Sequence, residues 1–449
     1  MISVVIPVLN GEKYIRPCLE SVLSQNIKDI EVIVVDGGSN DGTLQIIKNF
    51  IEKDLRIRLL QSSKKSYGAQ MNLGISNVKG EYFAILEADD ILPQNAYEIL
   101  LNKIKCTGAD LVKGNYKNFV SGEFENIITI PTDIFQNKQD IYDKEITAKK
   151  YAEIIRKDRY VWCGLYDIDF IRKNNIWFNE TPGAAFQDNG FLIQTLILAN
   201  KVVYIKDYVY FYRKDNDGSS VYSPKGYKYI ADEYSFIMEF LNRLSVEERL
   251  LYLPQIFLTI MDLVRTRSLL RATLNNASDV SNYEDINRII EILGKGLDAS
   301  VIGYDLRFQK DLFEMALFCE NPKLYLKYTQ KEIDAERHDV ECFFNRILNA
   351  NKIYVWGYGK TGAMFRALLH RKMYAGKIVW SDIVAKNEDD INVINAHTLA
   401  SEYSGDGIYV ICSEDHRYEI RDELHNRYGV PYSNILFYTI GTSQQLFFM

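Results

Sequence analysis

The chain has 449 residues, 47% of them hydrophobic and 25% charged, which is too long for one compact core and predicts two or three domains. A formal net charge of -7 excludes a general nucleic-acid-binding protein, which needs a basic surface to neutralise phosphates. No apolar run reaches the roughly 20 residues that cross a bilayer. We therefore expect a soluble protein, and peripheral contact with a membrane stays open.

Cysteines and histidines narrow the chemistry further. No two of the six cysteines stand at a zinc or redox spacing, and the first residues lack the pattern of an export signal. These features predict reduced thiols in a cytoplasmic protein. All five histidines lie from His338 onward, so the preceding 337 residues contain none. Metal binding or proton transfer in that part must therefore use carboxylates.

The first part of the chain alternates short apolar runs with amphipathic stretches. We expect strands at residues 2–6, 30–35, 57–60 and 81–86, and helices at residues 12–25, from 43 and at 69–78. This βαβα order predicts a mostly parallel, doubly wound sheet. In such a sheet the ligand site lies at the C-terminal ends of the strands.

The rest of the chain divides into less regular, helical and α/β parts. Residues 114–160 look irregular, 165–174 and 189–199 look helical, and 202–205 and 209–212 look like strands. The pattern from 225 to 348 is largely helical, and a second βα series opens at 352–356. We therefore expect an α/β domain over 1–224, a helical region over 225–348 and a small Rossmann-like α/β domain over 349–449.

Asp36 ends an apolar strand and enters a glycine-containing turn. A carboxylate there can accept hydrogen bonds from a base or from ribose hydroxyls, and glycine permits close approach. The alternative is an aspartate that only forms the turn. The residue by itself does not decide between these two roles.

Glu87, Asp89 and Asp90 stand within four residues directly after the strand at 81–86. Three such carboxylates repel one another unless a cation joins them. Oxygen ligands suit Mg²⁺ or Mn²⁺, which commonly bind one or two carboxylates and substrate phosphates. The alternatives are a solvated acidic turn, or a helix N-terminus capped by Asp89 or Asp90.

Four ordered motifs together resemble the family-2 glycosyltransferases, which have the GT-A fold. The motifs occupy residues 3–12, 35–43, 67–75 and 80–90, and a weaker similarity continues to about residue 222. The resemblance implies that residues 1–224 form an inverting GT-A catalytic domain that uses Mn²⁺ or Mg²⁺. It also implies a nucleotide diphosphate sugar, normally a UDP-sugar, as the donor.

The resemblance also implies individual roles. Asp36 would contact the base, Asp89 would bind the metal, and Glu87 would lie near the ribose or the metal. The expected donor-binding residues are Pro7, Leu9, Asn10, Glu12, Asp36, Gly68, Asn72, Glu87, Ala88 and Arg213. The sequence departs from the family pattern in two places, since Glu87 replaces an aspartate and Leu9 stands where an aromatic residue often stacks on the base.

A second carboxylate, Asp188, precedes an apolar helix and resembles the general base on the family's acceptor side. Gln187 stands where the family usually has glutamate, and Trp162 upstream could bind the acceptor with it. The alternatives are that Asp188 only caps its helix and that Trp162 fills the core. Arg213 could grip the diphosphate with its two-pronged guanidinium, or could be a solvated surface residue.

The segment 357–362 reads Gly-Tyr-Gly-Lys-Thr-Gly between an expected strand and helix, and Asp382 follows at the distance of a ribose-binding acid. This fingerprint is typical of a Rossmann-type domain. It is compatible with a bound nucleotide or sugar nucleotide, or with a structural, docking or dimerising role.

We thus expect a transferase that builds a surface polysaccharide or glycoconjugate of the capsule type. It would act in the cytoplasm or at the inner face of the membrane, on a saccharide or lipid-linked saccharide. The rival hypothesis is a nucleotide-binding or redox protein centred on the C-terminal module. The carboxylates expected to contact the base, to bind the metal and to act as the general base are all present in the first domain, which argues against that rival.

Overall fold

The computed structural model describes residues 1–121, 127–135, 139–216, 225–273, 283–298, 309–371, 374–384, 386–388, 391–413 and 416–438. The chain forms two compact units. The first comprises Met1–Phe119, Pro131–Arg271 and Asn276–Lys327, and the second is mainly Tyr328–Met449.

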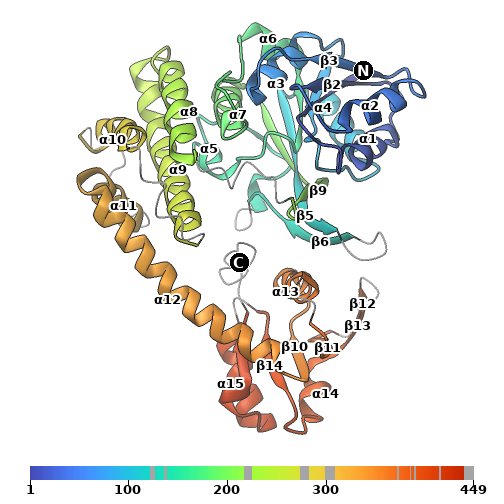
Figure 1. The fold of residues 1–449 in the computed structure, drawn as a ribbon, viewed down its shortest axis with the longest axis vertical. Coiled ribbons are helices and arrows are strands. Elements are labelled where there is room, and N and C mark those ends of the chain that lie inside the picture. Colours follow the sequence, from blue (N-terminus) through green and yellow to red (C-terminus); the bar gives the residue numbers. More distant parts are fainter. Residues whose placement is uncertain are drawn as a thin grey trace. The chain divides into compact units, whose positions relative to one another are not determined.

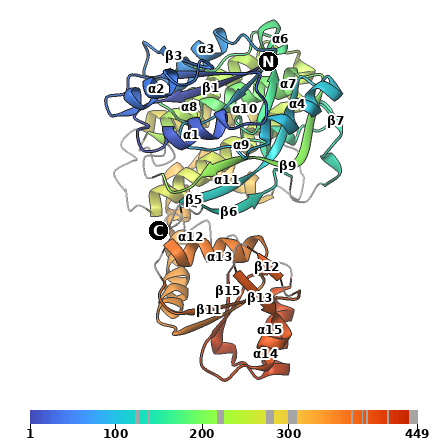
Figure 2. The same cartoon turned by 90° about the vertical axis from the view of Figure 1, so that its right-hand side faces the viewer.

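A nine-stranded sheet organises the first unit, in the order β3-β2-β1-β4-β8-β5-β9-β7 with β6 beside β5 (Figures 1 and 2). Its strands are β1 (Ile2–Val8), β2 (Ile30–Asp36), β3 (Ile57–Gln61), β4 (Tyr82–Ile85), β5 (Leu111–Ser121), β6 (Ile127–Thr132), β7 (Glu145–Ile146), β8 (Gly164–Asp167) and β9 (Val202–Arg213). The first four are mutually parallel. All residues of β1 and β2 are buried, as expected for strands covered on both faces.

The helices around this sheet are α1 (Ile15–Leu23), α2 (Thr43–Ile51), α3 (Tyr67–Ser76), α4 (Ala96–Thr107), α5 (Ile154–Lys157), α6 (Ile168–Lys173) and α7 (Gln187–Leu198). Helix α3 packs on β1 and β2, and its small residues allow a close approach. A Cβ atom on Gly74 would lie 2.3 Å from a methyl carbon of Val5. The Ser66 hydroxyl caps α3 by accepting the Ala69 N–H at 3.2 Å.

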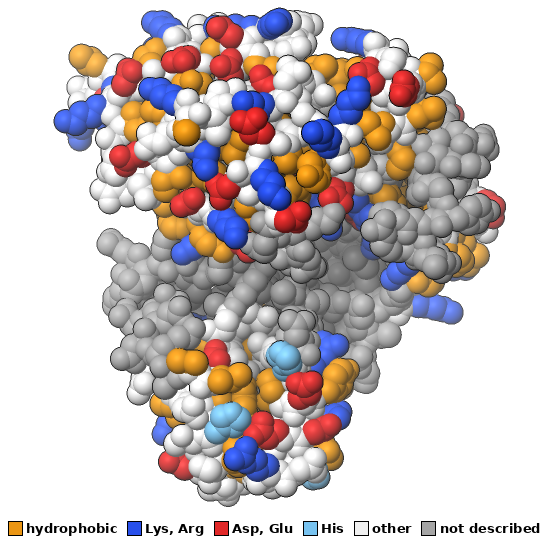
Figure 3. All heavy atoms as spheres, turned by 180° about the vertical axis from the view of Figure 1, so that it is seen from behind, with side chains coloured by type: hydrophobic (Ala, Val, Ile, Leu, Met, Phe, Trp, Pro, Cys, Tyr) orange, Lys and Arg blue, Asp and Glu red, His pale blue; other side chains and the backbone are white. Residues whose placement is uncertain are grey.

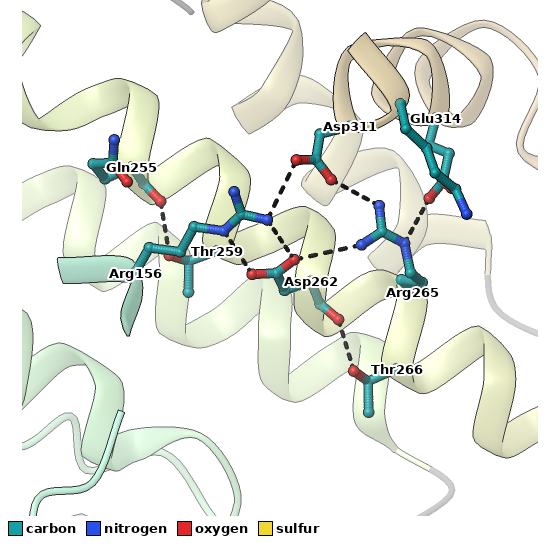
Figure 4. Close-up of polar contacts among 9 residues, drawn as sticks. Arg156, Gln255, Thr259, Asp262, Arg265, Thr266, Asp311 and Glu314 are labelled. Atoms are coloured by element: carbon teal, nitrogen blue, oxygen red, sulfur yellow. Dashed lines mark hydrogen bonds and ion pairs between the residues drawn. The ribbon is translucent and has the colours of Figure 1, made fainter. Parts of the chain in front are cut away.

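Five further helices confirm the expected helical region: α8 (Gly226–Leu241), α9 (Val246–Thr273), α10 (Tyr283–Asp298), α11 (Gln309–Glu320) and α12 (Pro322–Leu348). Helices α8 to α11 belong to the same compact unit as the nine-stranded sheet. Figure 4 shows one link, in which Arg156 of α5 pairs with Asp262 at 2.9 Å and with Asp311 at 3.3 Å. Arg265 of α9 pairs with Asp311 at 2.9 Å and Glu314 at 2.7 Å, which extends the network to α11.

The second unit has a sheet in the order β12-β13-β11-β10-β14-β15, parallel except at β12. Its elements are β10 (Lys352–Trp356), α13 (Lys360–Arg371), β11 (Lys377–Asp382), β12 (Lys386–Glu388), β13 (Ile391–Asn395), α14 (Ala396–Ser401), β14 (Ile408–Ile411), α15 (Arg417–Tyr428) and β15 (Ile435–Phe437). Along β10, Ile353 and Val355 enter one buried cluster, and Tyr354 and Trp356 enter another. Both faces of this sheet are therefore covered, as in a Rossmann-like domain.

Three expectations for the first unit were wrong. Residues 165–174 begin as strand β8, because Leu165 and Tyr166 are fully buried between β4 and β5. The region after residue 114 continues the long strand β5, which pairs with β9. The two strands expected at 202–212 are one strand, β9, because it continues past a shift in its pairing register with β5 between Tyr204 and Tyr208.

Charged side chains of both signs are interspersed over the face of the first unit that Figure 3 shows. This distribution agrees with a modest net charge and does not resemble the basic stripe of a nucleic-acid-binding surface. Within the described part of the chain, no helix is both long enough and apolar enough to cross a membrane.

Candidate active site

The acidic loop after β4 is fastened to β9 through Asp90. The Asp90 side chain has no exposed surface, and it accepts the Tyr210 hydroxyl at 2.8 Å and the Arg213 N–H at 2.7 Å. The Tyr210 hydroxyl in turn accepts the Glu87 N–H at 3.0 Å. Burial, with a smaller contribution from Asp89, raises the pKa of Asp90 well above its ordinary value. Asp90 therefore holds the loop in place, and helix α4 begins later, after Asn95.

The carboxylate and the backbone carbonyl of Asp89 are bonded to the end of β9 and to the residues just after it. Its Oδ2 accepts the Asn216 side-chain amide at 2.7 Å, and its backbone carbonyl accepts the Arg213 Nε–H at 2.7 Å. Within the described residues, no hydrogen bond or ion pair engages the other carboxylate oxygen. The half-buried Asp89 side chain thus keeps one oxygen available for a ligand.

Glu87 is bonded to helix α3. Its Oε1 accepts the Tyr67 hydroxyl at 2.7 Å. Burial raises the pKa of Glu87 to about 8, the Tyr67 hydrogen bond opposes this, and the charges of Asp89 and Asp188 add to it. The Tyr67 N–H donates to the Gly183 carbonyl at 2.9 Å, so the loop after β4 and the segment that leads to α7 meet at the start of α3.

Asp188 lies in the first turn of α7, whose N-cap residue makes no side-chain cap hydrogen bond. The residue before the helix, Phe186, has a φ of 66°, a left-handed conformation that is unusual for a bulky residue and costs about 1–3 kcal/mol. Burial raises the pKa of Asp188, whereas the charge of Arg159 lowers it. The Asp188 carboxylate also accepts the Asn189 side-chain amide at 3.1 Å, and hydrogen bonds from the backbone of Asp188 and Asn189 lower its pKa, so its position is compatible both with capping the helix and with acting as a base.

The loop after β1 and the turn after β2 hold each other in place. The Asn10 N–H donates to Ser39 Oγ at 2.8 Å, and Asn10 Oδ1 accepts the Asn40 N–H at 2.9 Å. Glu12 Oε2 accepts the Gly42 N–H at 2.9 Å, at the start of α2. These bonds shape a continuous rim along the C-terminal ends of β1 and β2.

Asp36 lies inside this rim with 1% of its surface exposed. Its carboxylate accepts the Gly38 N–H at 3.0 Å and the Ser39 N–H at 3.1 Å. The structure therefore shows Asp36 ordering its own turn. Leu9 is 47% exposed on the preceding loop. An exposed apolar side chain beside this turn can contact a flat base.

The comparisons with known proteins agree with this geometry. The sequence profile of glycosyl transferase family 2 matches residues 3–183. Glycosyltransferase GlyG of Streptococcus pneumoniae serotype 4 is 34% identical over 226 residues, which are 48% of this chain and 71% of GlyG. The chain belongs to glycosyltransferase family 2.

Two further relatives extend the comparison. Glycosyltransferase GlyA of the same organism is 27% identical over 290 residues, 63% of this chain and 40% of GlyA. The crystal structure of S. aureus TarS aligns with a TM-score of 0.50 and 19% identity, covering 74% of this chain and 55% of TarS. The TarS alignment supports the GT-A type of fold, and this chain spans only part of either relative.

The remaining residues that the family resemblance indicated have varied surroundings. Arg213 is 8% exposed, with its guanidinium between the rings of Tyr14 at 4.7 Å and Phe119 at 4.4 Å. Trp162 is also 8% exposed and stacks on Tyr210, with ring centroids 4.2 Å apart. Both side chains therefore pack in the interior beside the acidic loop, and Arg213 is not a solvated surface residue.

Asn72, Gly68 and Gln187 fasten the segment that leads to α7. The Asn72 side chain bonds the backbone of Phe178 at 2.9 Å in both directions, beside a cavity of about 600 Å³ at the outer face of α3. Gly68 has no room for a Cβ atom, which would lie 1.9 Å from the Asn179 carbonyl oxygen. Gln187 is 2% exposed and donates to the Thr181 carbonyl at 2.6 Å.

Pro7 and Ala88 complete the expected donor-binding set. Pro7 belongs to β1 and pairs with Val35 of β2. Ala88 lies half-buried between Glu87 and Asp89 and packs against the main core. Both residues therefore lie at strand ends beside the rim and the acidic loop.

The family resemblance implies a divalent metal at Asp89, and the residues around it can be compared with the needs of such an ion. Among the described residues, no group of three or more His, Cys, Asp or Glu side chains is placed to hold a metal ion. Mg²⁺ and Mn²⁺ commonly take only one or two carboxylates and complete their coordination with phosphates and water. Asp89, with its open oxygen and a fixed backbone, fits such a substrate-completed site.

Some residues of the site were missed from the sequence. Tyr67 lies within a family-like motif, so its position could have drawn attention, but nothing indicated that it bonds Glu87. Tyr210 and Asn216 contact Asp90 and Asp89 across more than 100 residues of sequence. No local pattern contains such a pairing, so only the fold reveals it.

The glycine loop of the second unit is closed mainly by its own residues. Gly357 has a φ of 105°, and a Cβ atom on Gly362 would lie 2.2 Å from the Gly357 carbonyl oxygen. Asp382 Oδ2 accepts the Tyr358 N–H of this loop at 2.9 Å. These contacts show that Gly357, Gly362 and Asp382 each help to form the turn between β10 and α13.

Proposed function

We propose that this family-2 glycosyltransferase moves a sugar from a UDP-sugar to a hydroxyl of a saccharide, with inversion at the anomeric carbon. One observation supports the proposal: Tyr67 donates its hydroxyl to Glu87 in the loop after β4 and its N–H to the Gly183 carbonyl just before α7, the helix that carries Asp188. In this proposal Asp89 serves the leaving group and Asp188 serves as the base within one site.

Asp188 is the proposed general base. Its carboxylate takes the proton of the acceptor hydroxyl as the oxygen attacks the anomeric carbon of the donor. The bond from that carbon to the β-phosphate oxygen breaks, and UDP leaves with the electron pair. A half-buried carboxyl with a raised pKa is a better proton acceptor than an ordinary aspartate, which supports this role.

Asp89 is the proposed metal ligand on the donor side. A Mn²⁺ or Mg²⁺ ion bound there would stabilise negative charge on the leaving diphosphate. Asn216 and Arg213 orient the Asp89 side chain and backbone. We assign Glu87 to a donor hydroxyl, because its Oε1 is held by Tyr67 and its raised pKa favours the protonated form.

The donor's nucleoside is proposed to lie along the rim formed by the loops after β1 and β2. Leu9 would contact the base, and Asn10 and Glu12 fix the rim that receives it. The base contact expected for Asp36 requires its carboxylate to serve the turn and the donor together. Trp162 would act on the acceptor side by supporting Tyr210 and Tyr212 from behind.

The wider role is proposed from the family resemblance. We propose that the acceptor belongs to a surface polysaccharide or glycoconjugate, such as a capsule, and is a free or lipid-linked saccharide. Synthesis would take place in the cytoplasm or at the inner face of the membrane. Self-association through the second unit is a further possibility that size measurement in solution can test.

Calorimetric titration with UDP tests the donor side without knowledge of the sugar. We expect binding in the presence of Mn²⁺, much weaker binding in EDTA, and weaker binding of GDP. Asp89→Asn should remove the effect of Mn²⁺ while leaving the fold intact. UDP binding that is equal with and without Mn²⁺ would contradict the assignment of Asp89.

A further inference from the structure

Glu233 of α8 is a buried carboxyl group that the proposed chemistry does not use. Its residue surface is 1% exposed. Oε1 accepts the Gly190 N–H at 2.7 Å, and Oε2 accepts the Asn179 side-chain amide at 3.0 Å. Both oxygens are therefore directed at segments that border the candidate active site.

The first contact is with the beginning of α7, two residues after Asp188. A Cβ atom on Gly190 would lie 2.3 Å from Glu233 Oε1 and 2.9 Å from the ring of Phe236. Only glycine lets α8 approach this turn so closely. Glu233 satisfies a backbone donor of the first turn from outside the helix.

The second contact reaches the start of α3. The carbonyl oxygen of Asn179 lies against Gly68, and the neighbouring Tyr67 donates to Glu87. The Glu233 carboxyl group on α8 thus bonds two segments. One is the first turn of α7, which carries Asp188. The other is the segment around Asn179, which lies beside Tyr67, the residue that bonds Glu87.

We propose that Glu233 is a positioning residue that fixes the first turn of α7 so that Asp188 meets the acceptor hydroxyl. The proposal rests on the proposed role of Asp188 as the base. The helices after residue 225 would then contribute directly to the geometry of catalysis.

The hydrogen bonds to Glu233 and its burial act on its ionisation in opposite directions. Burial raises the pKa of Glu233 to about 8, opposed by the bonds from Asn179 and Gly190, and the charges of Asp188 and Asp232 add to the rise. Glutamine has the same shape and offers a carbonyl oxygen to the Gly190 N–H, and its amide can donate to Asn179 once the Asn179 side-chain amide turns its own oxygen toward it.

The test compares turnover in the wild type and three purified variants. We expect Glu233→Ala to lower kcat by about 10²-fold, which is the loss typical when a catalytic group is misplaced by about 1 Å. The KM for the donor should change little. Glu233→Gln should stay within about threefold of the wild type, because it still accepts the Gly190 N–H. Glu239 is exposed on the same helix, and Glu239→Ala serves as the matched control. Glu233→Asp, which withdraws the oxygen from Gly190, replaces Glu233→Ala if that variant does not fold.

A double-mutant cycle with Asp188→Asn separates positioning from packing. If Glu233 acts through Asp188, Glu233→Ala costs less than about threefold once Asp188 is replaced. Independent, multiplicative losses in the double variant would overturn the proposal and leave the role of Asp188 intact. Wild-type turnover in Asp188→Asn alone would overturn the base assignment itself. A folded Glu233→Ala protein with normal kcat would show that the contact only packs the helices.

Discussion

The acidic loop after β4 and the glycine loop after β10 are both strand-end motifs, but their surroundings differ. Around the acidic loop, side chains from α3, α7 and β9 converge, and burial raises the pKa of three carboxyl groups, those of Glu87, Asp90 and Asp188. Around the glycine loop, Asp382 accepts N–H groups from Tyr358 and Ile383. Asp382 therefore stabilises its own turn.

The comparison shows that a sequence motif gains chemical meaning from the groups that other elements direct at it. Perturbed carboxyl groups that share a region are typical of functional sites. A glycine loop with close backbone contacts can equally be a tight strand-to-helix turn. We therefore expect substitutions at the first site to remove activity and substitutions at the second to leave it.

The largest effect is expected for Asp89→Ala. This variant should lose all measurable transfer and stay folded, because the side chain is half-buried and its loop is held by Asp90. Steady-state turnover and circular dichroism would check both parts. Excess EDTA should abolish wild-type transfer in the same assay, and full turnover in EDTA would contradict metal dependence.

Asp188→Asn should lower kcat by about 10²–10⁴, the usual contribution of a general base. Donor binding should persist, because Asp188 is proposed to act on the acceptor and not on the donor. The base acts when deprotonated and its pKa is raised, so wild-type kcat should fall with decreasing pH at values above the ordinary aspartate pKa of about 3.9. A pH profile that is flat down to that value would count against Asp188.

An intermediate effect, on stability, is expected at the buried pair of Lys113 and Asp158. Both side chains are fully buried, 2.7 Å apart, and Asp158 precedes Arg159, whose charge acts on Asp188. Lys113→Met leaves a buried carboxylate without its cation and should lower the free energy of unfolding by about 3–5 kcal/mol. The control is Lys103→Met at the exposed pair with Asp143, for which urea titration should show less than about 1 kcal/mol.

The smallest effect is expected for Gly359→Ala in the glycine loop. No atom lies within 4 Å of the position that a Cβ would occupy, so alanine fits without displacing a neighbour. Transfer should stay near the wild-type rate. Loss of transfer in the folded variant would mean that a ligand of this loop controls the enzyme, and the contrast between the two loops would fail.

Local sequence patterns were sufficient for β1 to β4, because apolar runs ending in polar turns mark parallel strands. They were insufficient for β8, where burial between β4 and β5 overrides an apparently helical pattern. The acidic loop could be located from its carboxylates, but the sequence could not show that Asp90 is buried and holds the loop while Asp89 keeps one oxygen open. That difference depends on Tyr210 and Asn216, more than 100 residues away.

The orientation of Asp36 was likewise beyond sequence reasoning. A carboxylate at a strand end can face a ligand or its own turn, and only the backbone of Gly38 and Ser39 shows which bonds it makes. Glu233 gave no signal at all, since an isolated glutamate in an amphipathic helix is usually a solvated residue.

The central claim is that the first unit cleaves a nucleotide diphosphate sugar at the acidic loop. It is tested most directly by incubating the purified chain with Mn²⁺ and a panel of nucleotide sugars without acceptor, and measuring the nucleoside diphosphate released by slow hydrolysis. We predict release from a UDP-sugar, its loss in EDTA and in Asp89→Ala, and its persistence in Gly359→Ala. Release that survives Asp89→Ala and is lost in Gly359→Ala would place the chemistry at the wrong loop and contradict the account.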